Sequence, residues 1–314
     1  MSKQNFGKLF STIILLTLLV VGGAMVFGQY SILSMGQIKN LNADNSLLDL
    51  ITFSKNNQEE AKTEKWNGLE MTKEYNAKTK VPIVMYHSYA NFQSIPLNDT
   101  NPELSRGNRT PPEVFEKQVK ILKARGITTI SFKDLEDYKN GKIQIPKSSI
   151  ILTFDDGWSD NFSAYKDALK LGVMASFAIV GSFVDKPDRL STSQIKEMSD
   201  NGMEIISHSM SHKALSKLNL VDLRYELVNS KELLEKITGK AVNTIVYPAG
   251  DYSQTVIEES VKAGYTFGRT TELFVDTSDL NKPFQLPQMR SQCSRKSGIR
   301  DGDCDNLGNS YFAT

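Results

Sequence analysis

From Val81 onward, short apolar runs alternate with amphipathic segments, and this alternation restricts the fold more than any other feature of the sequence. The apolar runs have the length of strands, and the segments between them repeat apolar residues at helical spacing. A parallel pair of strands needs a long crossover connection, which is usually a helix. The pattern therefore predicts an α/β fold, either a (β/α) barrel or an open doubly wound sheet.

The boundaries of these elements follow from the apolar runs and from the turn residues beside them. Thr110 is expected to cap the first helix and Gly126 to close it, with Pro111 and Glu113 inside the first turn. The other expected helices are Asp160–Leu171, Thr192–Asn201, Asn219–Thr238 and Gln254–Ala263. The expected strands are Val81–Tyr86, Ile127–Phe132, Ser149–Phe154, Val173–Val180, Met203–Ser207, Thr244–Tyr247, Tyr265–Thr270 and Phe284–Ser291.

Composition excludes several functions. The 37 basic and 36 acidic side chains give a net charge of +1, so no bulk charge favours nucleic acid. No glycine-rich phosphate-binding motif follows any predicted strand, which removes the usual support for nucleotide binding.

The N-terminus predicts a membrane anchor. Residues 9–35 carry no charge, and the most apolar part, Leu9–Phe27, is long enough to cross about 30 Å of hydrocarbon as one helix. Lys3 and Lys8 precede it, so the positive-inside rule places the rest of the chain outside the cell. We expect an uncleaved single-pass anchor or signal segment (1–35), a polar extracellular stalk (36–80) and a catalytic domain (81–314). Cleavage of the first segment would make the protein secreted.

Two cysteines, Cys293 and Cys304, lie near the C-terminus. Outside the cell a disulfide between them is the expected state.

Two motifs directly after predicted strands carry metal-binding chemistry. Asp155 and Asp156 end one strand, and Gly157 permits the chain to break there so that both carboxylates can converge. His208 and His212 end another strand, at a spacing that places both imidazoles on one side of a turn. With Asp156 they form an Asp-His-His set that leaves open positions on one metal. An ordinary Asp-Asp-Gly turn and two surface histidines remain the alternatives.

Two weaker signals follow other strands. His87 ends the first strand, where a core or loop histidine is the alternative. Tyr247 and Pro248 belong to a Tyr-Pro-Ala-Gly-Asp stretch at another strand end. In parallel α/β folds the chemistry lies beyond the C-terminal ends of the strands, where all of these residues fall. A two-metal phosphoesterase is a further candidate, although it usually needs more ligands than three histidines leave.

The motifs TFDDG, SHSMSH and YPAGDYS, in this order, resemble those of the polysaccharide deacetylases with a NodB-like domain (carbohydrate esterase family 4). The opening PIVMYHSY and the late LPQMRSQ resemble the circularly permuted subgroup that deacetylates poly-β-1,6-N-acetylglucosamine. The resemblance covers about residues 81–292. It implies a distorted (β/α) barrel and one divalent metal, with zinc favoured and cobalt, nickel, manganese or iron also compatible.

The resemblance also implies roles for single residues. Asp155 matches the general base, and Asp156, His208 and His212 match the metal ligands. His87 matches the general acid of the permuted subgroup. A backbone N–H near Pro248–Gly250 would stabilise the oxyanion, which makes Tyr247 and Pro248 candidate substrate residues.

The chain departs from the non-permuted members at one position. They carry an arginine in contact with the base, where this chain has Val246. Arg290, on the last predicted strand, is our candidate substitute. For Asp251, in the same stretch, a turn-forming role is as well supported as a role in the site.

We therefore expect an extracellular N-deacetylase that acts on N-acetylglucosamine units of an exopolysaccharide or of peptidoglycan. The alternatives are a carbohydrate-binding protein with this fold and a polysaccharide O-acetyl esterase. The long polar loop Ala90–Arg109 follows His87 and is where we expect substrate specificity to lie.

Overall fold

The computed structural model describes residues 81–91, 109–273, 280 and 282–290 of the chain. The predicted anchor (1–35), the stalk (36–80), the pair Cys293–Cys304 and most of the loop 90–109 lie outside these residues. Within them, no helix is both long enough and apolar enough to cross a membrane.

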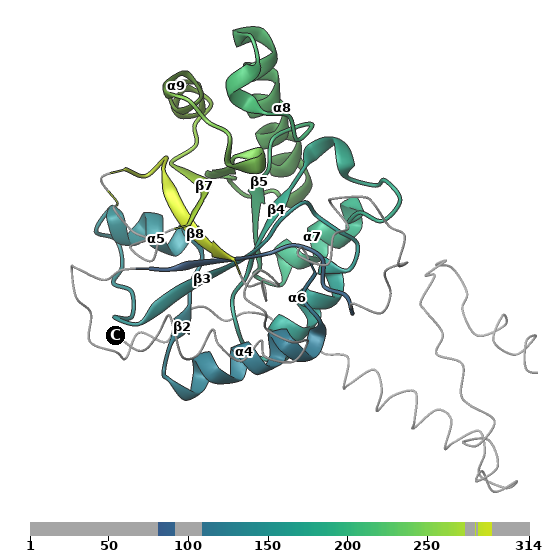
Figure 1. Cartoon of the computed structure of the whole chain (residues 1–314), viewed down its shortest axis with the longest axis vertical. Coiled ribbons are helices and arrows are strands. Elements are labelled where there is room, and N and C mark those ends of the chain that lie inside the picture. Colours follow the sequence, from purple (N-terminus) through teal and green to yellow (C-terminus); the bar gives the residue numbers. More distant parts are fainter. Residues whose placement is uncertain (1–80, 92–108, 274–279, 281, 291–314) are drawn as a thin grey trace, which may run out of the picture. The chain divides into compact units, whose positions relative to one another are not determined.

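Strands and helices alternate along the described chain, as the sequence predicts (Figure 1). The strands are β1 (Ile83–Tyr86), β2 (Thr128–Thr129), β3 (Ser149–Phe154), β4 (Ser176–Ile179), β5 (Glu204–Ser207), β6 (Thr244–Val246), β7 (Phe267–Leu273) and β8 (Leu286–Arg290). The helices are α4 (Pro112–Ala124), α5 (Phe132–Lys139), α6 (Asn161–Lys170), α7 (Thr192–Asp200), α8 (Leu220–Thr238) and α9 (Gln254–Lys262).

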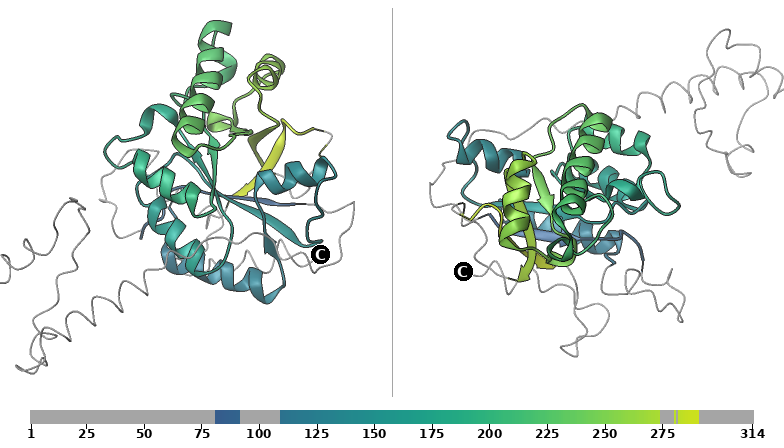
Figure 2. Two further views of the ribbon diagram at one scale, coloured as in Figure 1. Left: turned by 180° about the vertical axis from the view of Figure 1, so that it is seen from behind. Right: turned by 90° about the horizontal axis from the view of Figure 1, so that it is seen from above.

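The strands form one parallel sheet that closes into a barrel. Their order is β1-β8-β7-β6-β5-β4-β3-β2. The ring is closed by β1, which pairs with β8 on one side and with β3 on the other. Figure 1 and Figure 2 show the strands in the centre with helices around them. β2 is short and pairs only with the first two residues of β3. The barrel alternative of the sequence analysis is therefore confirmed, and the open sheet is wrong.

Each face of the ring has its own apolar cluster, because side chains alternate between the two faces of a strand. The inner cluster takes one residue from each strand of the ring: Ile83, Ile151, Ala178, Ile206, Val246, Phe267 and Leu286. The outer cluster joins the alternate strand residues to the covering helices. The whole of β3 is buried, which explains why apolar residues dominate its sequence.

Helix α5 closes the N-terminal end of the barrel. Phe132 and Leu135 on α5 join the inner cluster, and Phe132 contacts Phe267 at the start of β7. The prediction of a strand over Ile127–Phe132 is wrong beyond Thr128–Thr129. Ser131 and Asp134 form a capping box, in which each side chain accepts a hydrogen bond from the other residue's backbone N–H, and this starts a helix at Phe132.

The first helix also begins one residue later than predicted. Its N-cap is Pro111, whose backbone is extended, and no side chain caps it, so Thr110 is not the cap. The reason is the second proline, since Pro112 disfavours helical backbone in the residue before it.

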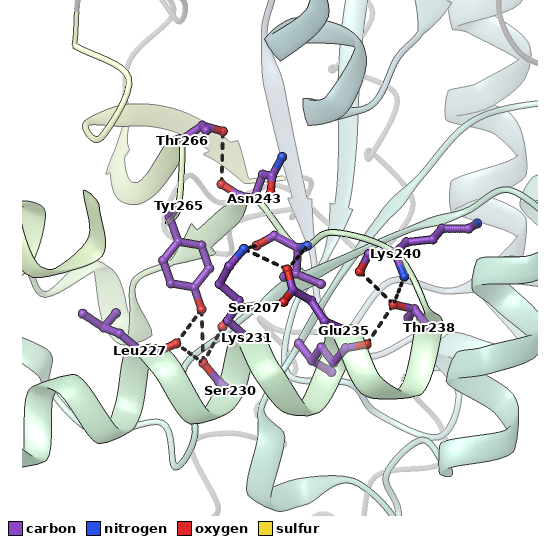
Figure 3. Close-up of polar contacts among 12 residues, drawn as sticks. Ser207, Leu227, Ser230, Lys231, Glu235, Thr238, Lys240, Asn243, Tyr265 and Thr266 are labelled. Carbon is purple, nitrogen blue, oxygen red and sulfur yellow. Dashed lines mark hydrogen bonds and ion pairs between the residues drawn. The ribbon is translucent and has the colours of Figure 1, made fainter. Parts of the chain in front are cut away.

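Buried polar contacts hold α8 against the end of β5 and against the residues just before β6 and β7 (Figure 3). The hydroxyls of Ser207 and Ser230 lie 2.9 Å apart, and the Tyr265 hydroxyl donates to the backbone oxygen of Leu227 at 2.9 Å. Lys231 donates to the backbone oxygen of Val242 at 2.6 Å. Because Ser207 is the last residue of β5, these contacts hold the strand end from which the histidine motif leaves.

Candidate metal centre and active site

The chain turns sharply after β3, and this turn separates the two neighbouring carboxylates. Asp156 has φ 75° and Gly157 has φ 65°, both in the left-handed region. Strained backbone of this kind at a non-glycine residue is typical of functional sites. Asp155 stays buried against the barrel, and Asp156 turns toward β5, so the break predicted at Gly157 is present.

Asp156, His208 and His212 form a cluster of metal-ligating atoms. Oδ1 of Asp156 lies 3.4 Å from Nε2 of His208 and 3.5 Å from Nε2 of His212. One ligand atom from each residue lies within 4.8 Å of the others. The two imidazoles approach edge to face, with ring centroids 4.8 Å apart. The structure thus brings together the three residues that the sequence predicts as metal ligands.

The hydrogen bonds around this cluster fit a metal. His208 Nδ1 lies 2.8 Å from the backbone oxygen of Val246, which makes Nδ1 the donor and leaves the Nε2 lone pair toward the cluster. The Trp158 indole N–H donates to Oδ2 of Asp156 at 3.2 Å, which leaves Oδ1 toward both histidines. Ligand orientation by outer hydrogen bonds of this kind is usual in protein metal sites.

The protonation tendencies of the cluster reflect burial and mutual charge. Burial and the nearby His208 lower the pKa of His212 to about 4, so its imidazole is neutral at pH 7. Burial alone would lower the pKa of His208, but the hydrogen bond with Asp156 and the charges of Asp155 and Asp156 raise it overall. Burial opposes ionisation of Asp156, yet the three histidines hold the pKa of this carboxyl well below its usual range.

Loop residues support the ligands from behind. Ser209 and His212 both have positive φ, and the Ser209 hydroxyl accepts the His212 N–H at 3.1 Å. The buried carboxylate of Glu226 on α8 accepts the Ser211 N–H at 2.7 Å. Arg189 donates to the backbone oxygen of Asp156 at 3.1 Å. The ligand loops are therefore held independently of any ion.

Arg269 on β7 is the arginine that contacts Asp155. Its guanidinium forms an ion pair with Oδ2 of Asp155, and its side chain is fully buried. The backbone of Arg269 pairs with that of Val246, the position at which the resemblance implies an arginine. The neighbouring strand thus supplies the group that Val246 lacks.

Sequence reasoning missed Arg269. The one available signal was a charge inside an otherwise apolar and small-residue run, Phe267-Gly268-Arg269-Thr270, since a fully buried charge needs a partner. The side chain of Arg290 lies outside the described part of β8, so the role assigned to Arg290 stays a prediction.

His87 lies just beyond β1 and faces the same site. The charges of Asp155 and Asp156 act on it, together with those of Arg269 and His208. Burial lowers the pKa of its imidazole, and the two carboxylates oppose this. Its Nδ1 is buried and has no hydrogen-bond partner among the described residues. An imidazole nitrogen next to two carboxylates can donate or accept a proton at the site.

The segment after β6 offers one backbone donor. The Tyr247 N–H donates to the backbone oxygen of Arg269 at 3.0 Å and belongs to the sheet, while Pro248 has no N–H. The N–H groups of Gly250 and Asp251 turn back onto Tyr247 and Pro248. Ala249 has φ 53°, and among the described residues its N–H donates to none.

The side chains of this segment serve packing. Tyr247 is buried and stacks on Tyr252 at 5.4 Å between ring centroids. Asp251 accepts the N–H and the hydroxyl of Ser216 at 2.7 and 2.8 Å, which ties this segment to the loop that follows His212. The Asp251 side chain therefore makes a contact between two loops, and its turn-forming role stays a prediction.

Comparison with known proteins agrees with this geometry. Residues 142–268, which include both aspartates, both metal-site histidines and the Tyr-Pro segment, match the family described as polysaccharide deacetylase. The chain carries a polysaccharide deacetylase domain of the NodB type. The closed parallel barrel and the Asp-His-His cluster agree with this match.

Three proteins illustrate how similar this chain is to other deacetylases in sequence and in fold. YxkH of Bacillus subtilis is 30% identical over 194 residues, which cover 62% of this chain and 65% of YxkH. The peptidoglycan-N-acetylglucosamine deacetylase of Bacillus cereus is 27% identical over 171 residues, or 54% of this chain and 59% of that protein. The structure of the Streptococcus pyogenes deacetylase PplD in complex with acetate superposes with a TM-score of 0.60 at 25% identity, covering 67% of this chain and 92% of PplD. The chain thus spans less than two thirds of both curated relatives.

Proposed function

We propose that the protein is a metal-dependent polysaccharide N-deacetylase that removes acetyl groups from N-acetylglucosamine units and releases acetate. The observation that carries the proposal is the convergence at one end of the barrel of Asp156, His208 and His212 with the Asp155–Arg269 pair. Membership of the polysaccharide deacetylase family and the activity named for the Bacillus cereus relative support it.

Asp156, His208 and His212 would hold one divalent metal, with zinc favoured and cobalt, nickel, manganese or iron also compatible with this donor set. When bound, such an ion supplies a Lewis acid for the acetamide carbonyl and makes a nearby water more acidic. The Ala249 N–H is the backbone donor available to the oxygen that becomes negative as water adds to the carbonyl carbon.

Asp155 is the proposed general base. Arg269 occupies Oδ2 of Asp155, and Oδ1 is buried with no partner among the described residues, so this oxygen is the one available to take the proton of the attacking water. The ion pair with Arg269 orients the Asp155 carboxylate, as a third group commonly orients a catalytic base.

His87 is the proposed general acid. As the bond between the carbonyl carbon and the amide nitrogen breaks, a proton from His87 converts the nitrogen into a leaving amine. The products are acetate and a glucosamine unit. A strand-end histidine beside Asp155 supports the resemblance to the subgroup that acts on poly-β-1,6-N-acetylglucosamine.

We place the enzyme at the cell surface, on an exopolysaccharide or on peptidoglycan. The uncharged residues 9–35 behind Lys3 and Lys8 support a single-pass anchor with the catalytic domain outside, or secretion if this segment is cleaved. The peptidoglycan activity named for the Bacillus cereus relative supports an envelope polymer.

Acetate release tests the proposal. Poly-β-1,6-N-acetylglucosamine, peptidoglycan and an acetylated xylan are offered to the purified protein, each with and without chelator. We expect chelator-sensitive release from one of the two N-acetylated polymers and its loss in Asp155→Asn. Release from xylan alone would identify an O-acetyl esterase. Metal binding without release from any polymer would contradict an enzymatic function.

A further inference from the structure

Helix α6 and the residue before it hold three consecutive residues at the end of β1. The Asn161 side-chain amide donates to the backbone oxygen of His87 at 2.7 Å. The Ser88 hydroxyl donates to Asp160 at 2.5 Å, and the Tyr89 hydroxyl donates to Asp167 at 2.6 Å. Each contact joins parts of the chain that are far apart in sequence.

Asn161 binds the first backbone oxygen beyond the hydrogen-bonded part of β1. The last ladder bond between β1 and the chain after β3 runs from the Asp155 N–H to the backbone oxygen of Tyr86 at 2.9 Å. The next backbone oxygen along β1 belongs to His87, and Asn161 binds it. Asn161 is fully buried, and its amide nitrogen also donates to Asp160 at 3.1 Å, so its rotamer is fixed.

The same short segment carries the base, a metal ligand and this contact. Asp155 and Asp156 open the turn after β3, and Asn161 is the first residue of α6 at its end. Both ends of this segment are buried, and it joins the two carboxylates to the residue that binds the His87 backbone oxygen. A displacement of about 1 Å in a catalytic group can cost about 100-fold in rate.

We infer that Asn161 is a positioning residue that holds His87 in place for proton donation to the leaving nitrogen. The inference rests on the function proposed above, in which His87 is the general acid. Asn161 itself touches neither the cluster of metal ligands nor Asp155 in any described hydrogen bond.

Leaving-group dependence separates positioning from general damage. An amide needs a proton on its leaving nitrogen, whereas 4-nitrophenyl acetate releases a stable phenolate without one. In Asn161→Ala we expect kcat for the N-acetylated polymer to fall about 10- to 100-fold and kcat for 4-nitrophenyl acetate to change less than about threefold. Equal losses on both substrates with metal still bound would overturn the inference.

Asn201→Ala is the matched control. Asn201 also donates through its amide nitrogen to a neighbouring element, at 3.0 Å to the hydroxyl of Tyr165, but it lies at the end of α7. We expect this variant to leave the ratio of amide to ester hydrolysis unchanged. A change in the ratio as large as that in Asn161→Ala would overturn the inference.

A double variant tests whether Asn161 acts through His87. If it does, His87→Ala with Asn161→Ala deacetylates the polymer no more slowly than His87→Ala alone, because residues that act as a unit are not additive. A further loss of about 10-fold or more in the double variant would contradict the inference.

Hydrogen exchange supplies a readout that does not depend on activity. In Asn161→Ala we expect faster exchange in peptides covering residues 82–91 and no change there in Asn201→Ala. Unchanged exchange in 82–91 would overturn the inference even in an active enzyme. If the unmodified protein hydrolyses neither substrate, the proposed function fails first and the role for Asn161 fails with it, which differs from a change in the amide-to-ester ratio.

Discussion

Arg269 is the largest fully buried side chain of the described domain, and its charge is balanced by Asp155. Removal of one member of a buried ion pair leaves the other charge without compensation, which typically costs about 3–5 kcal/mol. We expect Arg269→Met to lower the free energy of unfolding by this amount, measured by urea denaturation, and to lower deacetylation with it.

The double variant Arg269→Met with Asp155→Asn provides the control. It removes both charges, so we expect most of the lost stability to return, while activity is lost with the base. A double variant no more stable than Arg269→Met would show that Arg269 acts through packing instead of charge.

Alanine substitutions at two glycines with positive φ distinguish the cost of backbone strain from the cost of steric crowding. A Cβ at Gly250 would clash with the hydroxyl of Thr271 and lie 2.7 Å from its backbone nitrogen, whereas a Cβ at Gly239 would meet nothing within 4 Å. Gly250→Ala should therefore cost about 3 kcal/mol and Gly239→Ala about 1 kcal/mol in unfolding free energy. Equal costs would mean that the segment after β6 can shift.

Single residues with distinctive chemistry could be predicted from the sequence. Asp155, Asp156, His87, His208 and His212 all stand at strand ends, so chain position alone brought them to one end of the barrel. The partner of Asp155 could not be predicted, because it depends on which strand lies beside β6 and in what register. Register is a property of the folded sheet and leaves no local pattern.

At the scale of elements, a carboxylate on β5 binds the N-terminal end of α5. Glu204 at the start of β5 accepts the N–H groups of Phe132 and Lys133 at 2.9 and 2.8 Å, and the Ser176 hydroxyl at 2.5 Å. These donors favour the ionised form, but burial outweighs them and raises the pKa of Glu204 to about 7 from 4.5.

A raised pKa means that the folded protein binds more protons than the unfolded chain between pH 4.5 and about 7. The contribution of Glu204 is therefore greatest below pH 4.5 and is lost as the pH rises through about 7, by an amount on the order of 3 kcal/mol. We expect the slope of unfolding free energy against pH to be flatter in Glu204→Gln, measured between pH 5 and pH 8 without metal. Parallel slopes would assign the pH dependence to other groups.

Most elements could be predicted because apolar runs and helical spacing mark them clearly in the sequence. An example is β3, a short apolar run whose bounds agree with the prediction. Helix α5 could not, because it is short and follows two threonines that favour a strand. Its helical state depends on the capping box and on Glu204, which is far away in sequence.

For the whole molecule, binding of the proposed metal would be coupled to folding, because its candidate ligands come from the ends of two different strands. An ion at 100 times its dissociation constant adds about 2.7 kcal/mol of stability. We expect added zinc to raise Tm, chelator to reverse the rise, and His212→Ala to abolish it. Lys213→Ala, at the exposed neighbouring position, should keep the rise. A rise that survives in His212→Ala would place the ion elsewhere.

The barrel closes where β1 meets β8, the first and last strands of the described chain. A nascent polypeptide on the ribosome can pair β1 with β3 early, but the other flank of β1 stays unpaired until β8 has been synthesised. His87 directly follows β1. A chain cut short before Leu286 would therefore keep both ligand loops but lack the strand that pairs with β1, from whose end the proposed acid extends.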